Sequence, residues 1–161
     1  MSNAVLVMGK TGSGKSTSME NLNPKETFIV NVVGKDLPFR GGNKRYNPAN
    51  KNYFATHNYG NIVNILKQID KTAPHVKTII IDDFQYTMSY EFMTTKTTGF
   101  EKFNEIAEHA FAIINTAKNL REDLTVVFLA HTEESVDSFG QKSYKIKTIG
   151  KLLDDKITIE G

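Results

Sequence analysis

The segment of the sequence with the clearest chemistry is a glycine-rich run that follows a short apolar stretch. It reads Gly9-Lys10-Thr11-Gly12-Ser13-Gly14-Lys15-Ser16, with Thr17 next, and matches the phosphate-loop pattern G-x-x-x-x-G-K-[ST]. Glycines permit backbone conformations that a Cβ forbids, so that backbone N–H groups can face a polyphosphate. We expect this whole segment to bind a nucleotide, with Lys15 on the β- and γ-phosphates and the Ser16 hydroxyl on Mg²⁺.

Polar residues at the ends of two later apolar runs would complete such a site. Asp82 follows the run 78–81, and its carboxylate would hold Mg²⁺ through water, opposite Ser16. Asp83 either polarises the attacking water or caps the helix that follows. His131 terminates the strand predicted at 125–130, where ligands of open parallel sheets bind, so we expect it to contact the γ-phosphate or its water rather than to be merely structural. The predicted catalytic group is therefore Lys15, Asp82, Asp83 and His131.

The elements that must position these residues alternate between strands and helices. Continuous apolar or β-branched runs predict buried strands over 4–8, 27–33, 78–81 and 125–130. Apolar residues at helical spacing predict helices over 61–69 and 103–117, and a short helix is expected from the phosphate loop to Leu22. The range 34–52 predicts a long loop, and alternation near residues 144–148 and 157–159 predicts edge strands or a hairpin.

This order of elements is typical of an α/β P-loop NTPase. We predict one RecA-like domain over residues 1–161, with a mainly parallel sheet flanked by helices and a C-terminal edge hairpin. The absence of cysteine excludes disulfides, thiol nucleophiles and cysteine-based metal centres. No apolar run is long enough to span a membrane and no signal peptide is recognisable, so we expect a cytoplasmic protein, in the host cytoplasm if it is phage-encoded.

The basic residues narrow the class of nucleotide-dependent protein. The net charge of +2 is too small to imply nucleic-acid binding by bulk charge, but the basic residues divide into 17 lysines and 3 arginines. A small-molecule P-loop kinase normally covers the transferred phosphate with several arginines, and only Arg121 lies after Leu120. The run Asn43-Lys44-Arg45-Tyr46 lacks the aspartate of a guanine-binding motif, and residue 83 is not the glutamate of an Asp-Glu helicase. A RecA-like ATPase core is the reading that fits.

Several segments together also indicate a family. The phosphate loop, Gly34-Lys35-Asp36-Leu37-Pro38-Phe39, Ile80-Ile81-Asp82-Asp83-Phe84, Leu129-Ala130-His131 and Lys147-Thr148-Ile149-Gly150-Lys151-Leu152-Leu153-Asp154 resemble the phage-encoded AAA-domain ATP-binding proteins. Within that group the chain is similar to RecA-like ATPases of the single-strand-annealing and recombination type. The resemblance implies ATP and Mg²⁺ as cofactors. Members of the group commonly continue beyond the last strand predicted here, so we expect the chain to be either truncated or a short variant without a final strand.

The resemblance leaves two catalytic parts open. RecA-like proteins carry a glutamate after the second strand to activate water, whereas this chain has Asn31 and then Asp36, so Asp83, Asp36 and Glu133 are the candidates for the base. They also complete the site with a cation from a neighbouring subunit. In a homo-oligomer of this chain that finger would be a lysine, drawn from Lys145, Lys147 or Lys151, unless these are charges that protect an edge strand.

The range 37–54 is the best candidate for contacts with nucleic acid. It contains four cations and four aromatic residues and no acid after Asp36: Arg40, Lys44, Arg45, Lys51, Phe39, Tyr46, Tyr53 and Phe54. Such a mixture suits single-stranded DNA, although the same aromatics would equally well pack on the sheet or on adenine. The ranges 94–99 and 134–142 lie where RecA-like proteins place their DNA loops, but Glu133, Glu134 and Asp137 oppose a phosphate backbone.

The sequence thus predicts a Mg²⁺-dependent ATPase that acts on single-stranded DNA in phage recombination or annealing. The alternatives are a nucleotide-gated assembly factor with little turnover and a small-molecule or nucleoside kinase.

Overall fold

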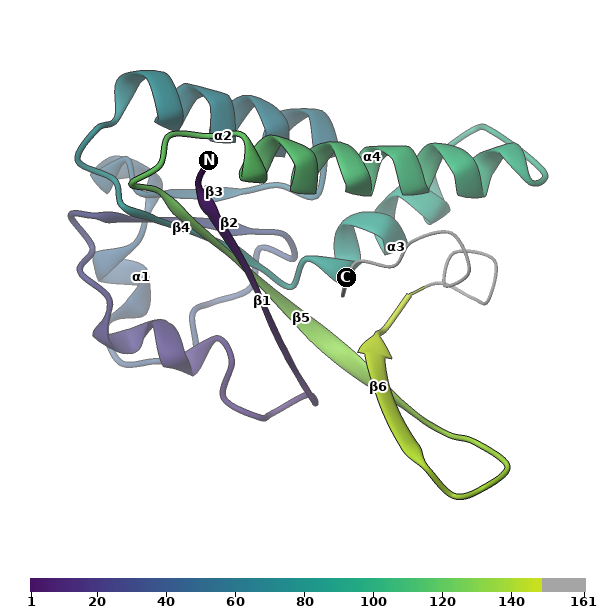
Figure 1. Cartoon of the computed structure of the whole chain (residues 1–161). Coiled ribbons are helices and arrows are strands. Elements are labelled where there is room, and N and C mark those ends of the chain that lie inside the picture. Colours follow the sequence, from purple (N-terminus) through teal and green to yellow (C-terminus); the bar gives the residue numbers. More distant parts are fainter. Residues whose placement is uncertain (149–161) are drawn as a thin grey trace.

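Five parallel strands form the central sheet of the computed structural model, which describes residues 1–148 (Figure 1). Their order is β1-β5-β4-β2-β3, so the first strand of the chain pairs with the fifth and the fifth with the fourth. The bounds are β1 (Asn3–Gly9), β2 (Thr27–Asn31), β3 (Tyr53–Ala55), β4 (Thr78–Asp82) and β5 (Thr125–Val136). The predicted fold class, an α/β P-loop fold with a mainly parallel sheet flanked by helices, is confirmed. Lys151 and the strand predicted near residues 157–159 lie outside the described residues.

Two long helices cover one face of the sheet, and Figure 1 shows them side by side across the top of the view. They are α2 (Tyr59–Thr72) and α4 (Glu101–Lys118), both predicted from their periodicity and both somewhat longer than predicted. Their apolar stripes bury Ile62, Leu66, Ile106 and Ile113 against the sheet. Burial of such an apolar stripe is the main stabilisation of a surface helix. The spacing of the apolar residues in the sequence therefore predicts the helix.

Within residues 1–148, the opposite face carries only short elements, namely η1 (Thr17–Asn21), α1 (Gly42–Arg45) and η2 (Pro48–Asn50). A second apolar cluster fills this side: Met19, Leu37, Phe39 and Tyr46 pack on Ile29, Ile80 and Leu129 of the sheet. The helix predicted after the phosphate loop is therefore a five-residue 3₁₀-helix, and the loop predicted over 34–52 contains two short helical turns. These segments are shorter than three helical turns, so the sequence contains no repeat of apolar residues from which a helix could be predicted.

The strand β3 was not predicted, and a helix after Asp83 was considered only as one that Asp83 would cap, whereas the N-cap residue of α3 (Gln85–Thr94) is Phe84. The strand β3 has only three residues, too few to show alternation. The helix α3 buries Gln85, Thr87 and Met88, so most of its inner face is polar and leaves no apolar stripe in the sequence.

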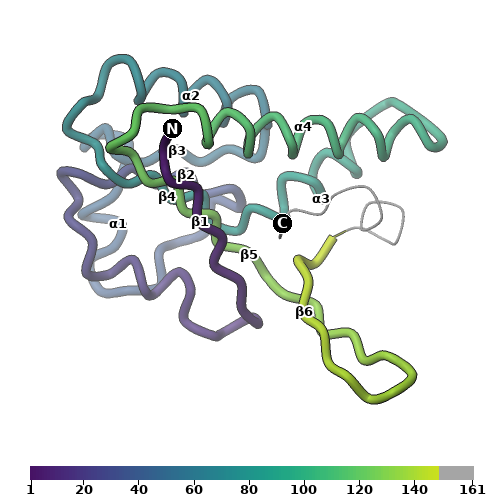
Figure 2. Tube along the Cα trace, viewed as in Figure 1, coloured from purple at the N-terminus to yellow at the C-terminus, as the bar shows by residue number. Residues whose placement is uncertain are grey.

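The end of β5 also differs from the prediction, because β5 does not end before His131 but continues to Val136. Its second half leaves the parallel sheet and pairs antiparallel with β6 (Lys142–Ile146), as Figure 2 shows for the yellow-green end of the chain. The predicted hairpin is present at β6, but its partner is the extension of β5. The polar residues 131–135 hide this extension in the sequence, because a two-stranded ribbon near solvent does not require alternating apolar residues.

Candidate functional site

The site lies where β1, β5 and β4 end together. In the parallel register Gly9 pairs with His131, and Asp82 closes β4 on the other side of β5. The sheet order thus brings together the phosphate loop, Asp82, Asp83 and His131, although they are spread over more than a hundred residues of sequence. These are the four groups that the sequence predicted to converge.

The phosphate loop is shaped by its glycines. Gly12 and Gly14 have φ angles of 77° and 90°, which disfavour any residue with a Cβ. A Cβ on Gly9 would lie 2.6 Å from Ser13 Oγ. The Lys15 ammonium lies inside the loop, where Nζ donates to the carbonyl oxygens of Gly9 at 2.7 Å and Lys10 at 2.9 Å. Burial lowers the pKa of Lys15, against the opposing charges of the nearby aspartates.

Ser16 and Asp82 meet directly. The Ser16 hydroxyl donates to Asp82 Oδ1 at 2.9 Å, and the Asp82 side chain is buried. Burial raises the pKa of the Asp82 carboxyl, and the charge of Asp83 adds to this effect. The second carboxylate oxygen, Oδ2, is buried and accepts no hydrogen bond from any described residue. An unsatisfied carboxylate oxygen beside a serine hydroxyl is a fitting pair of hard oxygen ligands for Mg²⁺.

Asp83 occupies a strained position next to it. Its φ of 61° lies in the left-handed region, uncommon for a residue other than glycine, and its carboxylate is almost fully buried. Oδ1 lies 3.0 Å from Nε2 of His131, whose Nδ1 lies 3.2 Å from the Thr11 hydroxyl. Burial and the charge of Lys15 lower the pKa of His131, so its neutral form donates from Nε2 to Asp83 and accepts from Thr11 at Nδ1.

Lys35 is the functional residue that the sequence prediction did not place here. Its Nζ lies 2.5 Å from Asp83 Oδ2, so the buried acid is held between a lysine and a histidine. Burial lowers the pKa of Lys35, but the ion pair with Asp83 outweighs it and leaves this pKa above its usual value. Asn31, at the end of β2, holds the segment: its Oδ1 accepts from Gly34 N–H and its Nδ2 donates to the Lys35 carbonyl. Gly-Lys just beyond a polar strand end is the signal that would have located it.

Two alternative bases lie in other surroundings. Asp36 is exposed and accepts a hydrogen bond from Asn43 Nδ2 at 2.6 Å. Glu133 is exposed on the ribbon, where it pairs with Lys145 in the antiparallel register.

The ribbon is tied to the phosphate loop by ion pairs. Glu134 lies 2.9 Å from Nζ of Lys10 and 2.7 Å from Nζ of Lys142, and these two cations lower the pKa of its carboxyl to about 2. The side chain of Lys10 is thus directed to the ribbon, whereas Thr17 begins η1 beside the loop. Lys147 follows β6, and its backbone N–H donates to the His131 carbonyl at 2.9 Å.

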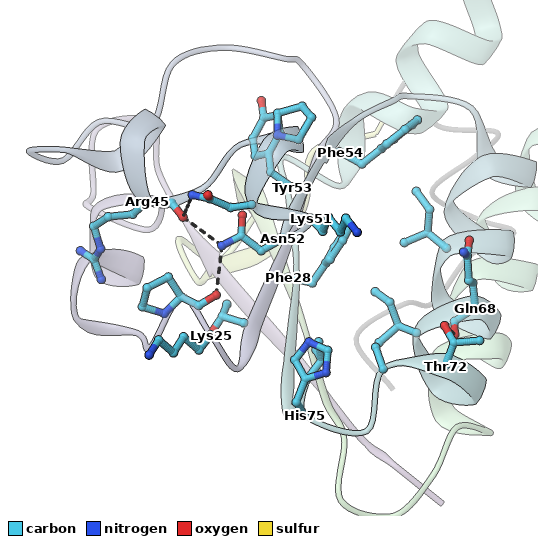
Figure 3. A pocket seen from close by; sticks show the side chains of 18 residues that line it. Lys25, Phe28, Arg45, Lys51, Asn52, Tyr53, Phe54, Gln68, Thr72 and His75 are labelled. Atoms are coloured by element: carbon cyan, nitrogen blue, oxygen red, sulfur yellow. Dashed lines mark hydrogen bonds between the residues drawn. The ribbon is translucent and has the colours of Figure 1, made fainter.

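A second concavity of about 1120 Å³ lies at the far edge of the sheet, between β2, β3 and α2. Figure 3 shows Phe28 and Phe54 projecting toward Gln68 and Thr72 of α2, while the Arg45 guanidinium points away from this gap. We call this concavity the aromatic groove; its lining includes the three cations Lys25, Arg45 and Lys51 and no acidic residue. The groups suited to phosphate chemistry lie at the other edge of the sheet.

Comparison with known proteins agrees with this geometry. A family model described as an AAA domain matches residues 1–158. The chain belongs to this AAA-domain family. Membership indicates nucleotide binding and ATPase activity, in keeping with the Lys15 loop and Asp82. No curated protein matches the chain. Among residues 1–148, no helix has the length and apolar character needed to cross a bilayer.

Proposed function

We propose that this AAA-domain protein is a Mg²⁺-dependent ATPase that acts on single-stranded DNA during phage recombination or annealing. The observation that carries the ATPase part is the direct hydrogen bond from Ser16 to Asp82, which joins the phosphate loop to the carboxyl end of β4. The phage and recombination parts rest on the sequence resemblance, and the DNA part on the aromatic groove.

The residues present fit Mg²⁺. The Ser16 hydroxyl and the Asp82 carboxylate, one oxygen of which has no hydrogen-bond donor among the described residues, would hold the ion. When bound, the ion neutralises charge on the β- and γ-phosphate oxygens. The Lys15 ammonium would exchange its contacts with the Gly9 and Lys10 carbonyls for phosphate oxygens, which are stronger, charged acceptors.

Asp83 is the best candidate for the group that orients the attacking water. Of the three acids considered, it is the one that lies beside both Asp82 and His131, while Asp36 and Glu133 are exposed and the Asp36 carboxylate accepts from Asn43. The neutral His131 ring fixes one carboxylate oxygen and leaves lone pairs of the acid for water. The left-handed backbone at Asp83 directs the carboxylate into the site, the kind of strain that accumulates at functional positions.

Lys35 supplies the cation in our proposal. Its ammonium is half-exposed and already pairs with an acid of the site, so it needs no neighbouring subunit to reach the developing charge on the γ-phosphate. The lysine finger from Lys145, Lys147 or Lys151 of a second subunit stays a prediction. Turnover per subunit that rises with protein concentration would assign the cation to the neighbour instead.

The aromatic groove supports the DNA part. Phe39 and Tyr46, two of the aromatics predicted to stack on bases, are buried in the second apolar cluster, and the Arg45 guanidinium donates to the carbonyls of Glu20 and Leu22. Lys51 and Phe54 stay exposed, and they border the acid-free groove. Exposed aromatics beside unopposed cations favour a single strand, whose bases can stack while its phosphates meet lysines.

Replacement of Lys15 by alanine tests the central claim. We expect turnover of Mg·ATP, measured as phosphate release with and without an oligothymidylate, to fall by roughly 10²-fold or more, because the main cation on the phosphates is lost. Lys10→Ala is the matched control, since its side chain pairs with Glu134 instead of entering the loop. Equal turnover in the Lys15 variant and the wild type would refute hydrolysis at this site. ATP binding without turnover in the wild type would favour the nucleotide-gated assembly factor.

A further inference from the structure

Three side chains from two helices converge at a place that the ATPase site does not use. Glu91 lies on α3, whereas Glu105 and His109 lie four residues apart on α4 and therefore share one face of that helix. The ligand atoms of all three lie within 4.8 Å of one another, and each side chain is partly buried. Figure 1 shows α3 beside the first half of α4, which is how the two helices bring these side chains together.

The imidazole is held in one orientation. The His109 ring stacks on Tyr59 of α2, with ring centroids 3.5 Å apart and an angle of 10° between the planes. This contact turns Nδ1 toward the glutamates, and Nδ1 is hydrogen-bonded to Glu91 Oε1. A ring that packing already holds in place loses little conformational entropy when its nitrogen binds a ligand, as expected of a preorganised site.

The carboxylates have support of their own. The Thr95 hydroxyl, in the connection between α3 and α4, donates to Glu105 Oε2 at 3.4 Å. Burial raises the pKa of Glu91, the His109 contact lowers it, and the nearby charge of Glu105 raises it further. Two carboxylates facing one imidazole carry a net charge of −2 when the ring is neutral, which a divalent cation balances.

We propose that Glu91, Glu105 and His109 bind a Zn²⁺ ion that links α3 to α4. One imidazole nitrogen and two carboxylate oxygens are a donor set that zinc accepts, with water in the fourth position, whereas Mg²⁺ prefers oxygen ligands alone. The ion would lie between His109 Nδ1 and Glu91 Oε1, which contact each other directly in this structure.

The test is a calorimetric titration of the full chain, freed of metal by a chelator, with Zn²⁺ in the absence of nucleotide. We expect one equivalent to bind, and Glu91→Gln, Glu105→Gln and His109→Asn each to weaken that binding at least tenfold. Glu108→Gln is the matched control, because Glu108 is exposed on the same helix one residue from the cluster. Circular dichroism establishes that each variant is folded, and Co²⁺ provides a second readout through its visible ligand-field bands, which should be lost with His109.

Two outcomes would overturn the proposal. If Zn²⁺ gives no saturable binding, the cluster is only an ion pair between helices. If Glu105→Gln and Glu108→Gln bind Zn²⁺ as the wild type does, the ion lies elsewhere, for example at Asp82. Neither result bears on ATP hydrolysis, which is measured with Mg²⁺ alone.

Discussion

The two edges of the sheet treat charge in opposite ways. At the carboxyl edge of β1, β5 and β4, acids are buried against cations of the same chain, as in the Lys35–Asp83–His131 group. In the aromatic groove at the β3 edge, Lys25 and Lys51 have no ion-pair partner among the described residues, and Phe28, Tyr53 and Phe54 are part of the lining. Burial of a charged group destabilises a fold, so buried charges are often found at functional sites. Exposed cations destabilise the fold little and can attract an anionic ligand. The comparison therefore separates the edge where we propose ATP hydrolysis from the edge where we propose DNA binding.

Substitution of Lys35 gives the strongest test of whether ATP hydrolysis and DNA binding belong to different edges of the sheet. We expect Lys35→Ala to reduce ATP turnover by roughly 10³-fold, because the cation for the γ-phosphate is lost and Asp83 keeps a buried charge without its lysine. Binding of single-stranded DNA should change less than twofold. Both quantities are measured on the same preparation, with Lys44→Ala as the control because Lys44 is exposed in the same connecting range. A variant that loses DNA binding and keeps its turnover would reverse the assignment of the two edges.

The converse experiment addresses the groove. Phe54→Ala should reduce the affinity for an oligothymidylate by roughly tenfold, since stacking of a base on an aromatic ring contributes about 1–3 kcal/mol. It should leave basal ATP turnover unchanged. Fluorescence anisotropy at low and physiological salt measures the affinity, and Lys51→Ala should in addition reduce its salt dependence. Phe111→Ala is the control, because Phe111 is exposed on α4, away from the groove. Equal losses in the two phenylalanine variants would remove the groove from the proposal.

The smallest expected effect concerns stability. Because burial raises the pKa of Asp82, its charged form destabilises the fold at pH values above that pKa, and this penalty disappears as the pH falls below the pKa of the unfolded chain. Asp82→Asn keeps an acceptor for Ser16 and removes the charge, so we expect the Tm to rise by a few degrees at pH 8 and by less at pH 4, with ATPase activity lost. A Tm that falls equally at both pH values would show that the carboxylate stabilises the fold.

The same contrast explains what the sequence could predict. The phosphate loop and the runs before Asp82 and His131 are local patterns, and the parallel order brings their ends together without further information. The role of His131 and the metal ligands Ser16 and Asp82 stay predictions, but their convergence follows from topology alone.

The remainder depends on contacts between distant segments. Lys35 reaches Asp83 because Asn31 holds the Gly34 turn, and no periodicity records that contact. Phe39 and Tyr46 were candidates for base stacking because composition does not distinguish a ring that covers the sheet from one that faces solvent. The extent of the α3 helix was not predictable for a related reason, since its buried Gln85 accepts from the His131 N–H through Oε1 and is not part of an apolar stripe.

The long β5 strand has a mechanical consequence. One uninterrupted backbone runs from the centre of the sheet through His131 into the β6 ribbon, and the ion pairs of Glu134 fasten that ribbon to Lys10 in the phosphate loop. The ribbon is therefore joined to the site at two points, through the backbone at His131 and through the ion pair between Glu134 and Lys10. A displacement of the ribbon would thus move the His131 ring beside Asp83 and the phosphate loop together.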